Sequence, residues 1–459
     1  MAIARATLSE SLSVVTRVFL PTVAKGVIIR RPAMVAIAER LSLDRRAVHT
    51  LQQLRERHGD GPLMLRIPGR SQAVLLSPRD VRRVLEGTPE PFTADSSEKR
   101  AALSHFEPEG VLVSHGADRV ERRRFNEQVL ESGCPRHRLA EQFASIVREE
   151  GGALLEAAEG QRSLAWDEFS RAWFRIVRRV VLGDGARQDD ELTHLLARLR
   201  SDANWAFLHP GRRALYARFM RRLEKHLERA EPGSLAQVMS MIPATRSTAP
   251  AGQVPQWLFA FDAAGIATFR AIALLSAHAD QATIARAEIA ASTEQPAPEL
   301  PYVRACVLES VRLWPTTPMI LRESTAETGW DEGTMPRGTG LLIFAPYFHR
   351  DATRLPFADR FTPEIWLHGA PERELGIVPF SDGPARCPGR EIVLLLASTM
   401  LSTLMRDGVP RLARPHRLDA ALPMPGTLDN YTLRFELARE AAAVRPEVHA
   451  MGHAGGVDR

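Results

Sequence analysis

Cysteine and lysine are scarce in this sequence of 459 residues. Its cysteines are Cys134, Cys306 and Cys387, which lie far apart and have none of the paired spacings of a zinc site. We therefore expect no zinc site and a reducing compartment. Only three of the 60 basic residues are lysines, and the arginines are spread along the chain rather than gathered in one block. This pattern predicts no nucleic-acid partner, while a diffuse positive face for an acidic protein partner remains open.

A long apolar run of the kind that spans a membrane is also missing near the start. The stretch Leu12–Ile29 is interrupted by Arg17, Pro21 and Lys25, whereas a span needs about 20 apolar residues. No small-residue cleavage site follows it. We expect a soluble cytoplasmic protein without a membrane span. The predicted organisation is a lead-in segment over residues 1–44 containing an amphipathic helix, one domain over 45–445, and a disordered tail over 446–459.

Hydrophobic periodicity predicts a mostly helical protein with small sheets. Between residues 118 and 241 one helix follows another, and a long apolar helix begins at Pro255. Residues 88–110 are turn-rich and are expected to form a surface excursion. Other predicted helices cover residues 45–58, 77–85 and 301–314; predicted strands cover 63–67, 73–76, 319–322, 340–344 and 431–437, the last following a hairpin turn at Pro425-Gly426.

The stretch Pro379–Met405 places Cys387 in a turn-rich loop directly before an apolar helix. At a helix N-terminus, free backbone N–H groups and the helix dipole favour a thiolate over a thiol. A thiolate can bind a metal or attack an electrophile. A buried structural cysteine is the alternative, because free cysteines are among the most buried residues.

Small residues occupy the middle of the long helix, where Ala263, Ala264, Gly265 and Ala267 precede Thr268. A glycine in a helix costs about 1 kcal/mol relative to alanine, which suggests a reason for its presence. Either a bulky group approaches the backbone there, or two helices pack closely.

A helix over residues 301–314 carries Glu309 and Arg312 on one face, since they are three residues apart. Such pairs usually lie on the surface, but the apolar residues around this pair predict partial burial.

Together these features resemble the cytochrome P-450 family of haem-thiolate monooxygenases, of the soluble bacterial type. The cysteine signature is matched by Phe380, Gly383, Cys387 and Gly389, whereas Ala385 replaces the usual arginine or histidine that binds a haem propionate. The resemblance implies that Cys387 is the iron ligand and that Phe380 and Gly389 lie against the cofactor. It also implies a mainly α fold with small β-sheets (α+β), a triangular helical prism around a buried haem b.

The resemblance extends to the long helix, where Ala264 and Gly265 match its cofactor-facing motif and Thr268 matches the alcohol that hydrogen-bonds dioxygen. Ala267 replaces the acid that helps to deliver protons. Asp262 is a poor substitute, because an offset of six residues turns it about 120° away from Thr268.

Charged residues complete the resemblance. Arg119, Arg123 and Arg322 match positions that bind the haem propionates, a role that suits the guanidinium fork. Glu309, Arg312 and Arg360 match a structural network of the family.

The resemblance implies a monooxygenase that activates dioxygen with a thiolate-ligated haem and oxidises an apolar small molecule, in secondary metabolism. Electrons would come from a ferredoxin or flavodoxin with its reductase, and the protein would be a monomer. Two alternatives remain open: a peroxide-driven peroxygenase, motivated by Ala267, and a catalytically silent haem-binding or partner-recruiting protein. Candidate substrate-pocket residues are Phe92, Ala260, Ala263, Thr317, Met319 and Leu428, in segments 92–110, 205–211, 260–268, 316–320 and 423–430.

Overall fold

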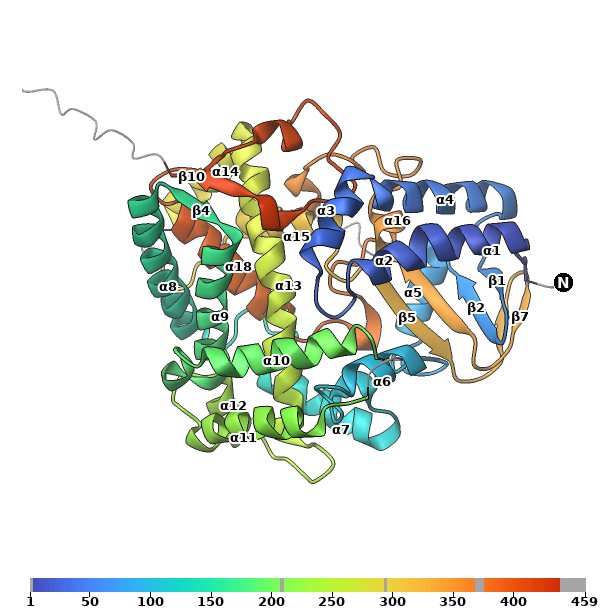
Figure 1. The fold of residues 1–459 in the computed structure, drawn as a ribbon, viewed down its shortest axis with the longest axis horizontal. Coiled ribbons are helices and arrows are strands. Elements are labelled where there is room, and N and C mark those ends of the chain that lie inside the picture. The colour runs from blue at the N-terminus through green and yellow to red at the C-terminus, as the bar shows by residue number, and fades with distance from the viewer. Residues whose placement is uncertain (1–2, 207–209, 293–294, 368–374, 438–459) are drawn as a thin grey trace, which may run out of the picture.

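One long helix, α13 (Pro250–Ala277), runs through the middle of the molecule in the computed structural model (Figure 1). Helices surround it on one side, and the largest sheet lies on the other side beneath the N-terminal helices (Figure 1). The structure describes residues 3–206, 210–292, 295–367 and 375–437.

The predicted predominance of helix is confirmed. The helices are α1 (Leu8–Val14), α2 (Leu20–Ala24), α3 (Pro32–Arg40), α4 (Leu43–His58), α5 (Pro78–Glu86), α6 (Ser97–Leu103), α7 (Gly116–Val129), α8 (Ala140–Gln161), α9 (Trp166–Leu182), α10 (Asp190–Ala203), α11 (Arg213–Arg229), α12 (Leu235–Met241), α13, α14 (Ala279–Ala291), α15 (Pro301–Leu313), α16 (Ala345–His349) and α18 (Arg390–Met405). The strands are β1 (Leu63–Ile67), β2 (Arg70–Val74), β3 (Phe92–Thr93), β4 (Ser163–Ala165), β5 (Met319–Ser324), β6 (Thr328–Trp330), β7 (Gly333–Met335), β8 (Gly340–Phe344), β9 (Arg411–Leu412) and β10 (Arg434–Glu436).

The main sheet has five strands in the order β1-β2-β8-β5-β3. The hairpin of β1 and β2 turns at Pro68-Gly69, where Gly69 has a φ of +70°. Strand β2 pairs in parallel with β8, and β8 pairs antiparallel with β5. The sheet therefore joins the N-terminal part of the chain to the segment that follows α15.

Two hydrophobic cores hold the elements in place. The larger core surrounds α13 and contains side chains of α8, α9, α15 and α18. The second core lies between the main sheet and the N-terminal helices, and includes Val14 and Val18. In the described part of the chain α13 is the one helix long and apolar enough to cross a membrane, but 78% of its most apolar window is buried inside the protein, as expected of a core helix.

The structure corrects four expectations about the elements. The first forty residues form two helical stretches, 8–24 and 32–40, rather than one helix, because the chain turns at Gly26 (φ +87°). Helix α13 begins at Pro250, five residues before Pro255. Pro255 is accommodated within the first turns of the helix.

The segment 88–110 is partly interior rather than a surface excursion, since Phe92 and Phe106 are buried and α6 lies within it. Strand β10 pairs antiparallel with β4 and with β9, the strand that precedes it in the chain. Pro425-Gly426 therefore lies in the long connection between two antiparallel strands rather than in a tight hairpin turn. The expected tail, 446–459, lies outside the described residues.

Candidate active site

The loop before α18 is held in shape around Cys387. At Gly383 the φ is +65°, and a Cβ atom there would lie 2.2 Å from the carbonyl oxygen of Leu85 in α5, so only glycine fits. The N–H of Cys387 donates to the carbonyl of Phe380 at 2.9 Å. The N–H of Gly389, just before α18, donates to the Cys387 sulfur. The loop thus fixes the thiol between α5 and the start of α18.

Burial raises the pKa of the Cys387 thiol, although the N–H of Gly389 and the positive charges of Arg123, Arg390 and Arg386 act in the opposite direction. The helix N-terminus alone therefore does not make a thiolate here, contrary to the sequence-based expectation, because desolvation outweighs it. A bound metal cation would deprotonate a coordinating thiol. The site is suited to a thiol that ionises on binding a metal.

On the central helix, the hydroxyl of Thr268 donates to the carbonyl of Ala264 at 2.8 Å, and both residues are buried. Ala260 and Ala263 are half-buried on the preceding turn. Because residues 260, 263, 264 and 267 share a helix face, this part of α13 presents a strip of small side chains.

Gly265 points elsewhere, which corrects its assignment to the cofactor. A Cβ atom at Gly265 would lie 2.8 Å from Cδ1 of Trp173 in α9. The Trp173 indole N–H donates to the carbonyl of Phe261 on the same helix at 2.7 Å. Of the two explanations for the glycine, close helix packing is the one the structure supports.

The missing acid on α13 is not replaced by its nearest carboxylate. Asp262 forms an ion pair with Arg200 of α10 at 2.7 Å. The carbonyl of Ala267 accepts from the hydroxyl of Ser310 on α15 at 2.8 Å. The carboxylate is thus committed to an ion pair, and Ala267 contributes only its backbone.

Two of the three predicted propionate arginines are buried, and among the described residues they donate to neutral acceptors. Arg119, 6% exposed, donates to the carbonyl of Val111 at 3.3 Å. Arg322, 3% exposed, donates to Thr88 Oγ1 at 3.0 Å, and its Nη2 lies 3.5 Å from Ser381 Oγ in the cysteine loop. Burial lowers the pKa of Arg322 to about 10, and the charge of Arg119 adds to this effect.

The third arginine differs from these two. Arg123 forms an ion pair with Glu127, one turn further along α7, at 2.6 Å. Its charge still acts on Cys387. Arg123 therefore already has a direct ion pair, whereas the carboxylate of Asp95 acts on Arg119 only through space, and no ion pair of Arg322 occurs among the described residues.

Lys99 belongs to the same cationic cluster and was missed by the sequence reasoning. Its ammonium donates to the carbonyls of Ala94 at 2.9 Å and Leu321 at 3.3 Å. Burial and the charges of Arg322 and Arg119 lower its pKa well below the usual value. One feature of the sequence would have drawn attention to this position: lysine is rare in so arginine-rich a chain.

The Glu309–Arg312 pair is fully buried on α15. Glu309 also accepts from the N–H of Thr362 at 2.7 Å and from the Trp366 indole at 3.2 Å. Arg312 donates to the carbonyl of Arg360 at 2.7 Å. The side chain of Arg360 is exposed, so this residue joins the network through its backbone, which corrects the expected three-charge arrangement.

The candidate substrate residues are not brought together as one set. Phe92 belongs to the second core and lies with its ring 6.0 Å from that of Trp330, which corrects its assignment to the pocket. Thr317 is exposed and Met319 is half-buried. Leu428 is fully buried and lines a separate cavity described below. Of the segment 205–211, residues 207–209 lie outside the described residues.

Comparison with known proteins identifies the family. The cytochrome P-450 family model matches residues 278–407. The chain belongs to the cytochrome P-450 family. The matched part of this P-450 contains Glu309, Arg312, Arg322 and Cys387.

Relatives align over the same limited length. Residues of this P-450 are 34% identical over 139 residues to cyclooctat-9-en-7-ol 5-monooxygenase of Streptomyces melanosporofaciens, covering 28% of this chain and 30% of that protein. They are 32% identical over 127 residues to ferruginol synthase of Salvia pomifera, covering 27% and 28%, and 33% identical over 122 residues to sugiol synthase of Salvia miltiorrhiza, covering 26% and 25%. The aligned stretches thus span less than a third of each relative.

The fold is shared over most of the chain. A cyanobacterial cytochrome P-450 with retinoic acid bound superposes with a TM-score of 0.67 at 17% identity, over 84% of this chain and 93% of the other. A second P-450 crystal structure gives a TM-score of 0.66 at 19% identity, over 85% and 93%. The expected fold, mainly helical with small sheets, is confirmed.

The residues of this P-450 fit a haem-thiolate group. Cys387 offers a half-buried sulfur with backbone support from Gly389. Arg119 and Arg322 are buried and Lys99 is half-buried, and the hydrogen bonds of these three cations go to neutral acceptors. Buried cations are stable when paired with anions, and the two propionates of a haem would supply these.

Proposed function

We propose that this P-450 is a haem-thiolate monooxygenase that oxidises an apolar small molecule. The observation that carries the proposal is the thiol of Cys387, held between α5 and the start of α18, together with three cations, Arg119, Arg322 and Lys99, that donate to neutral acceptors. The cofactor would be haem b, and electrons would come from a separate ferredoxin or flavodoxin with its reductase. The proposed setting is the cytoplasm.

Each part of the chain has a defined role in this proposal. When bound, haem supplies the oxidative chemistry, and a thiolate ligand favours O–O cleavage. Cys387 holds the iron, and the Gly389 N–H steadies the sulfur. Arg119, Arg322 and Lys99 hold the propionates and thereby set the position of the cofactor.

Thr268 handles the proton. Its hydroxyl donates to the carbonyl of Ala264. The hydroxyl oxygen can therefore still accept a hydrogen bond, for example from a water molecule. Because position 267 is alanine and Asp262 is paired with Arg200, protons must reach Thr268 through water rather than from a neighbouring carboxylate.

An apolar substrate is supported by the small apolar side chains of Ala260, Ala263 and Ala264 on α13. The names of two relatives, a cyclooctat-9-en-7-ol 5-monooxygenase and a ferruginol synthase, support an apolar substrate, and we place the proposed reaction in secondary metabolism. Arg386, exposed beside Cys387, offers positive charge to an acidic redox partner.

The thiolate ligand is tested with two matched cysteine variants. In Cys387→Ala the red-shifted Soret band of reduced, carbon-monoxide-bound protein should disappear, because the sulfur ligand is gone. In Cys134→Ala, whose cysteine is exposed, the band should be unchanged. A red-shifted band that persists in Cys387→Ala would show that another residue binds the iron.

A peroxide-driven reaction is the second candidate, favoured by the absence of an acid at Ala267. Turnover with hydrogen peroxide in place of a reductase would support it. Turnover that requires ferredoxin, reductase and dioxygen would support the monooxygenase instead.

A further inference from the structure

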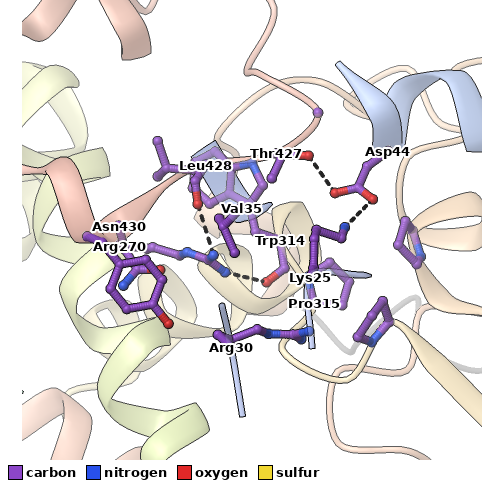
Figure 2. A pocket seen from close by; sticks show the side chains of 14 residues that line it. Lys25, Arg30, Val35, Asp44, Arg270, Trp314, Pro315, Thr427, Leu428 and Asn430 are labelled. Atoms are coloured by element: carbon purple, nitrogen blue, oxygen red, sulfur yellow. Dashed lines mark hydrogen bonds and ion pairs between the residues drawn. The ribbon is translucent and has the colours of Figure 1, made fainter. Parts of the chain in front are cut away.

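A small polar cavity lies between the N-terminal segment, α13 and the segment that precedes β10 (Figure 2). Its volume is about 40 Å³. Arginine and lysine side chains converge on it from separate parts of the chain: Lys25 and Arg30 from the turn after α2, and Arg270 from α13. The cavity is therefore built by tertiary structure rather than by one local motif.

The cations of this cavity outnumber the lining carboxylates. Lys25 forms an ion pair with Asp44, which also accepts from the Thr427 hydroxyl at 2.5 Å. Asp44 is thus fully engaged. The charges of Arg30 and Arg270 are left without a lining carboxylate, giving the cavity an excess of two positive charges.

Both arginines donate only to backbone carbonyls at the cavity. Arg30 donates to Gly26 and Thr316, each at 2.5 Å. Arg270 donates to Trp314 at 3.1 Å and Leu428 at 2.9 Å, and its Nε has no partner (Figure 2). Burial and the charge of Arg30 lower the pKa of Arg270 to about 10.

Two carboxylates beyond the lining act on these arginines from a distance, Asp262 on Arg30 and Asp429 on Arg270, but neither forms an ion pair with them among the described residues. Asp262 is paired with Arg200. Asp429 accepts from the N–H of Tyr431 at 3.1 Å and from the Thr432 hydroxyl, and burial raises its pKa. Both groups are engaged outside the cavity.

A second observation points to a ligand. Asn430 lines the cavity and is 1% exposed, yet neither its amide nitrogen nor its amide oxygen has a hydrogen-bond partner among the described residues. Buried amides are nearly always hydrogen-bonded. A group that accepts from the Asn430 amide and from both guanidinium groups would satisfy all of these donors.

We propose that this cavity binds a compact oxyanion, a carboxylate or phosphate group, through Arg30, Arg270 and Asn430. A water molecule needs about 10–15 Å³ by the same measure, so the cavity admits a head group of a few atoms. Arg270 lies two residues beyond Thr268, which turns it about 200° around the helix. The anion site is therefore distinct from the face of α13 that carries Thr268.

Two sources would supply this group: a free anion, or the acidic end of a longer apolar ligand that passes Leu428. Calorimetric titration of the purified holoprotein with sodium phosphate, at an ionic strength held constant with sodium chloride, tests the first. Soret titration with dodecanoate and dodecanol tests the second, because these ligands differ mainly in the charged end.

Arg30→Gln and Arg270→Lys are the test variants. Arg270→Lys keeps the positive charge but removes the planar guanidinium group with its paired N–H donors. Arg17→Gln is the matched control, since Arg17 is an exposed arginine on the helical stretch that precedes the turn carrying Arg30. If the ligand is a free anion, Arg30→Gln should weaken phosphate binding at least tenfold. If it is the acidic end of a longer ligand, Arg30→Gln should reduce the preference for dodecanoate over dodecanol at least tenfold. Arg17→Gln should leave both unchanged.

Binding of phosphate that depends on Arg30 identifies a free-anion site, and an Arg30-dependent preference for dodecanoate identifies an acidic ligand. Absence of both in wild-type protein overturns the proposal. The phosphate titration requires neither turnover nor a redox partner, so its failure is separate from a failure of the proposed monooxygenase activity.

Discussion

At the scale of one residue, Lys99 would offset the loss of a family feature under the proposed function. Ala385 stands where the resemblance places a propionate-binding cation, and the charges of Arg119 and Arg322 act on half-buried Lys99. Without an anion these cations repel one another. With haem bound, the propionates would turn that repulsion into attraction.

Replacing Lys99 by methionine should therefore have opposite effects on the two forms. Haem should dissociate about tenfold faster, because a charge-assisted hydrogen bond contributes roughly 1.5–3 kcal/mol. The apoprotein should melt at an equal or higher temperature, because repulsion is relieved. Haem transfer to excess apomyoglobin and a thermal melt measure the two effects.

Lys225→Met is the control, since Lys225 is an exposed lysine on α11. Its haem-loss rate and melting temperature should match those of wild type. Equal destabilisation of both forms by Lys99→Met would mean that Lys99 serves packing alone.

Single residues also mark the limit of sequence reasoning. The spacing around Cys387 predicted its loop, because turn residues and a helix start are local features. Phe92 was misplaced because an aromatic side chain fits a core and a pocket equally well, and only the pairing of β3 with β5 sets its direction. Lys99 carries no motif; its role arises from residues 20 and 223 positions away in sequence, Arg119 and Arg322.

At the scale of elements, α13 was predictable as a long apolar helix, but the partners of its faces were not. Periodicity gives one helix, whereas the neighbour of each face depends on α9, α10 and α15. The sequence predicts a start at Pro255, five residues late, because proline is favoured in the first turn of a helix. Periodicity likewise does not tell which neighbour Gly265 faces, and the contact with Trp173 depends on tertiary packing.

Gly265→Ala should destabilise the protein, although alanine is the better helix former. A Cβ atom 2.8 Å from the Trp173 ring forces α13 and α9 apart, and overpacking of this kind costs about 1–3 kcal/mol. Urea unfolding measures the change. The effect should shrink when Trp173→Phe is combined with Gly265→Ala.

Gly152→Ala is the matched control. Gly152 lies within α8, and a Cβ atom there would meet nothing within 4 Å. This substitution should raise stability by up to about 1 kcal/mol through helix propensity. Similar destabilisation by both substitutions would argue against the Trp173 contact as the cause.

At the scale of the whole molecule, α15 ties the larger core to the segment that follows α16. Glu309 and Arg312 together bond the backbone at Phe357, Ala358, Arg360 and Thr362. The chain between α16 and the cysteine loop thus depends on one buried ion pair.

Glu309→Gln should cost about 3–5 kcal/mol of unfolding free energy, because it leaves the Arg312 charge buried without its partner. Arg360→Ala should cost less than about 0.5 kcal/mol, because only the carbonyl of Arg360 is used. Chemical denaturation of the two variants side by side decides the point. A large loss in Arg360→Ala would restore the three-charge network expected from sequence.

His349 on α16 couples the same network to pH. It is fully buried; its Nδ1–H donates to the Arg312 carbonyl at 3.3 Å, and its Nε2 accepts from the N–H of Val378 at 2.8 Å. Burial and the charge of Arg312 lower its pKa to about 3. Protonation would remove the Nε2 acceptor and place a second positive charge beside Arg312.

Because the unfolded chain takes up this proton near pH 6.5 and the folded protein only near pH 3, stability must fall as the pH drops through that window. The loss from this one group is about 3 kcal/mol between pH 6.5 and pH 4. His349→Gln should be less stable than wild type at pH 7 but approach it as the pH falls, since glutamine does not titrate. Urea midpoints measured from pH 7 to pH 4 test this. For the control His194→Gln, whose histidine is exposed, the plot of urea midpoint against pH should run parallel to that of wild type. If the plot for His349→Gln also runs parallel to wild type, this histidine is not the group that takes up the proton.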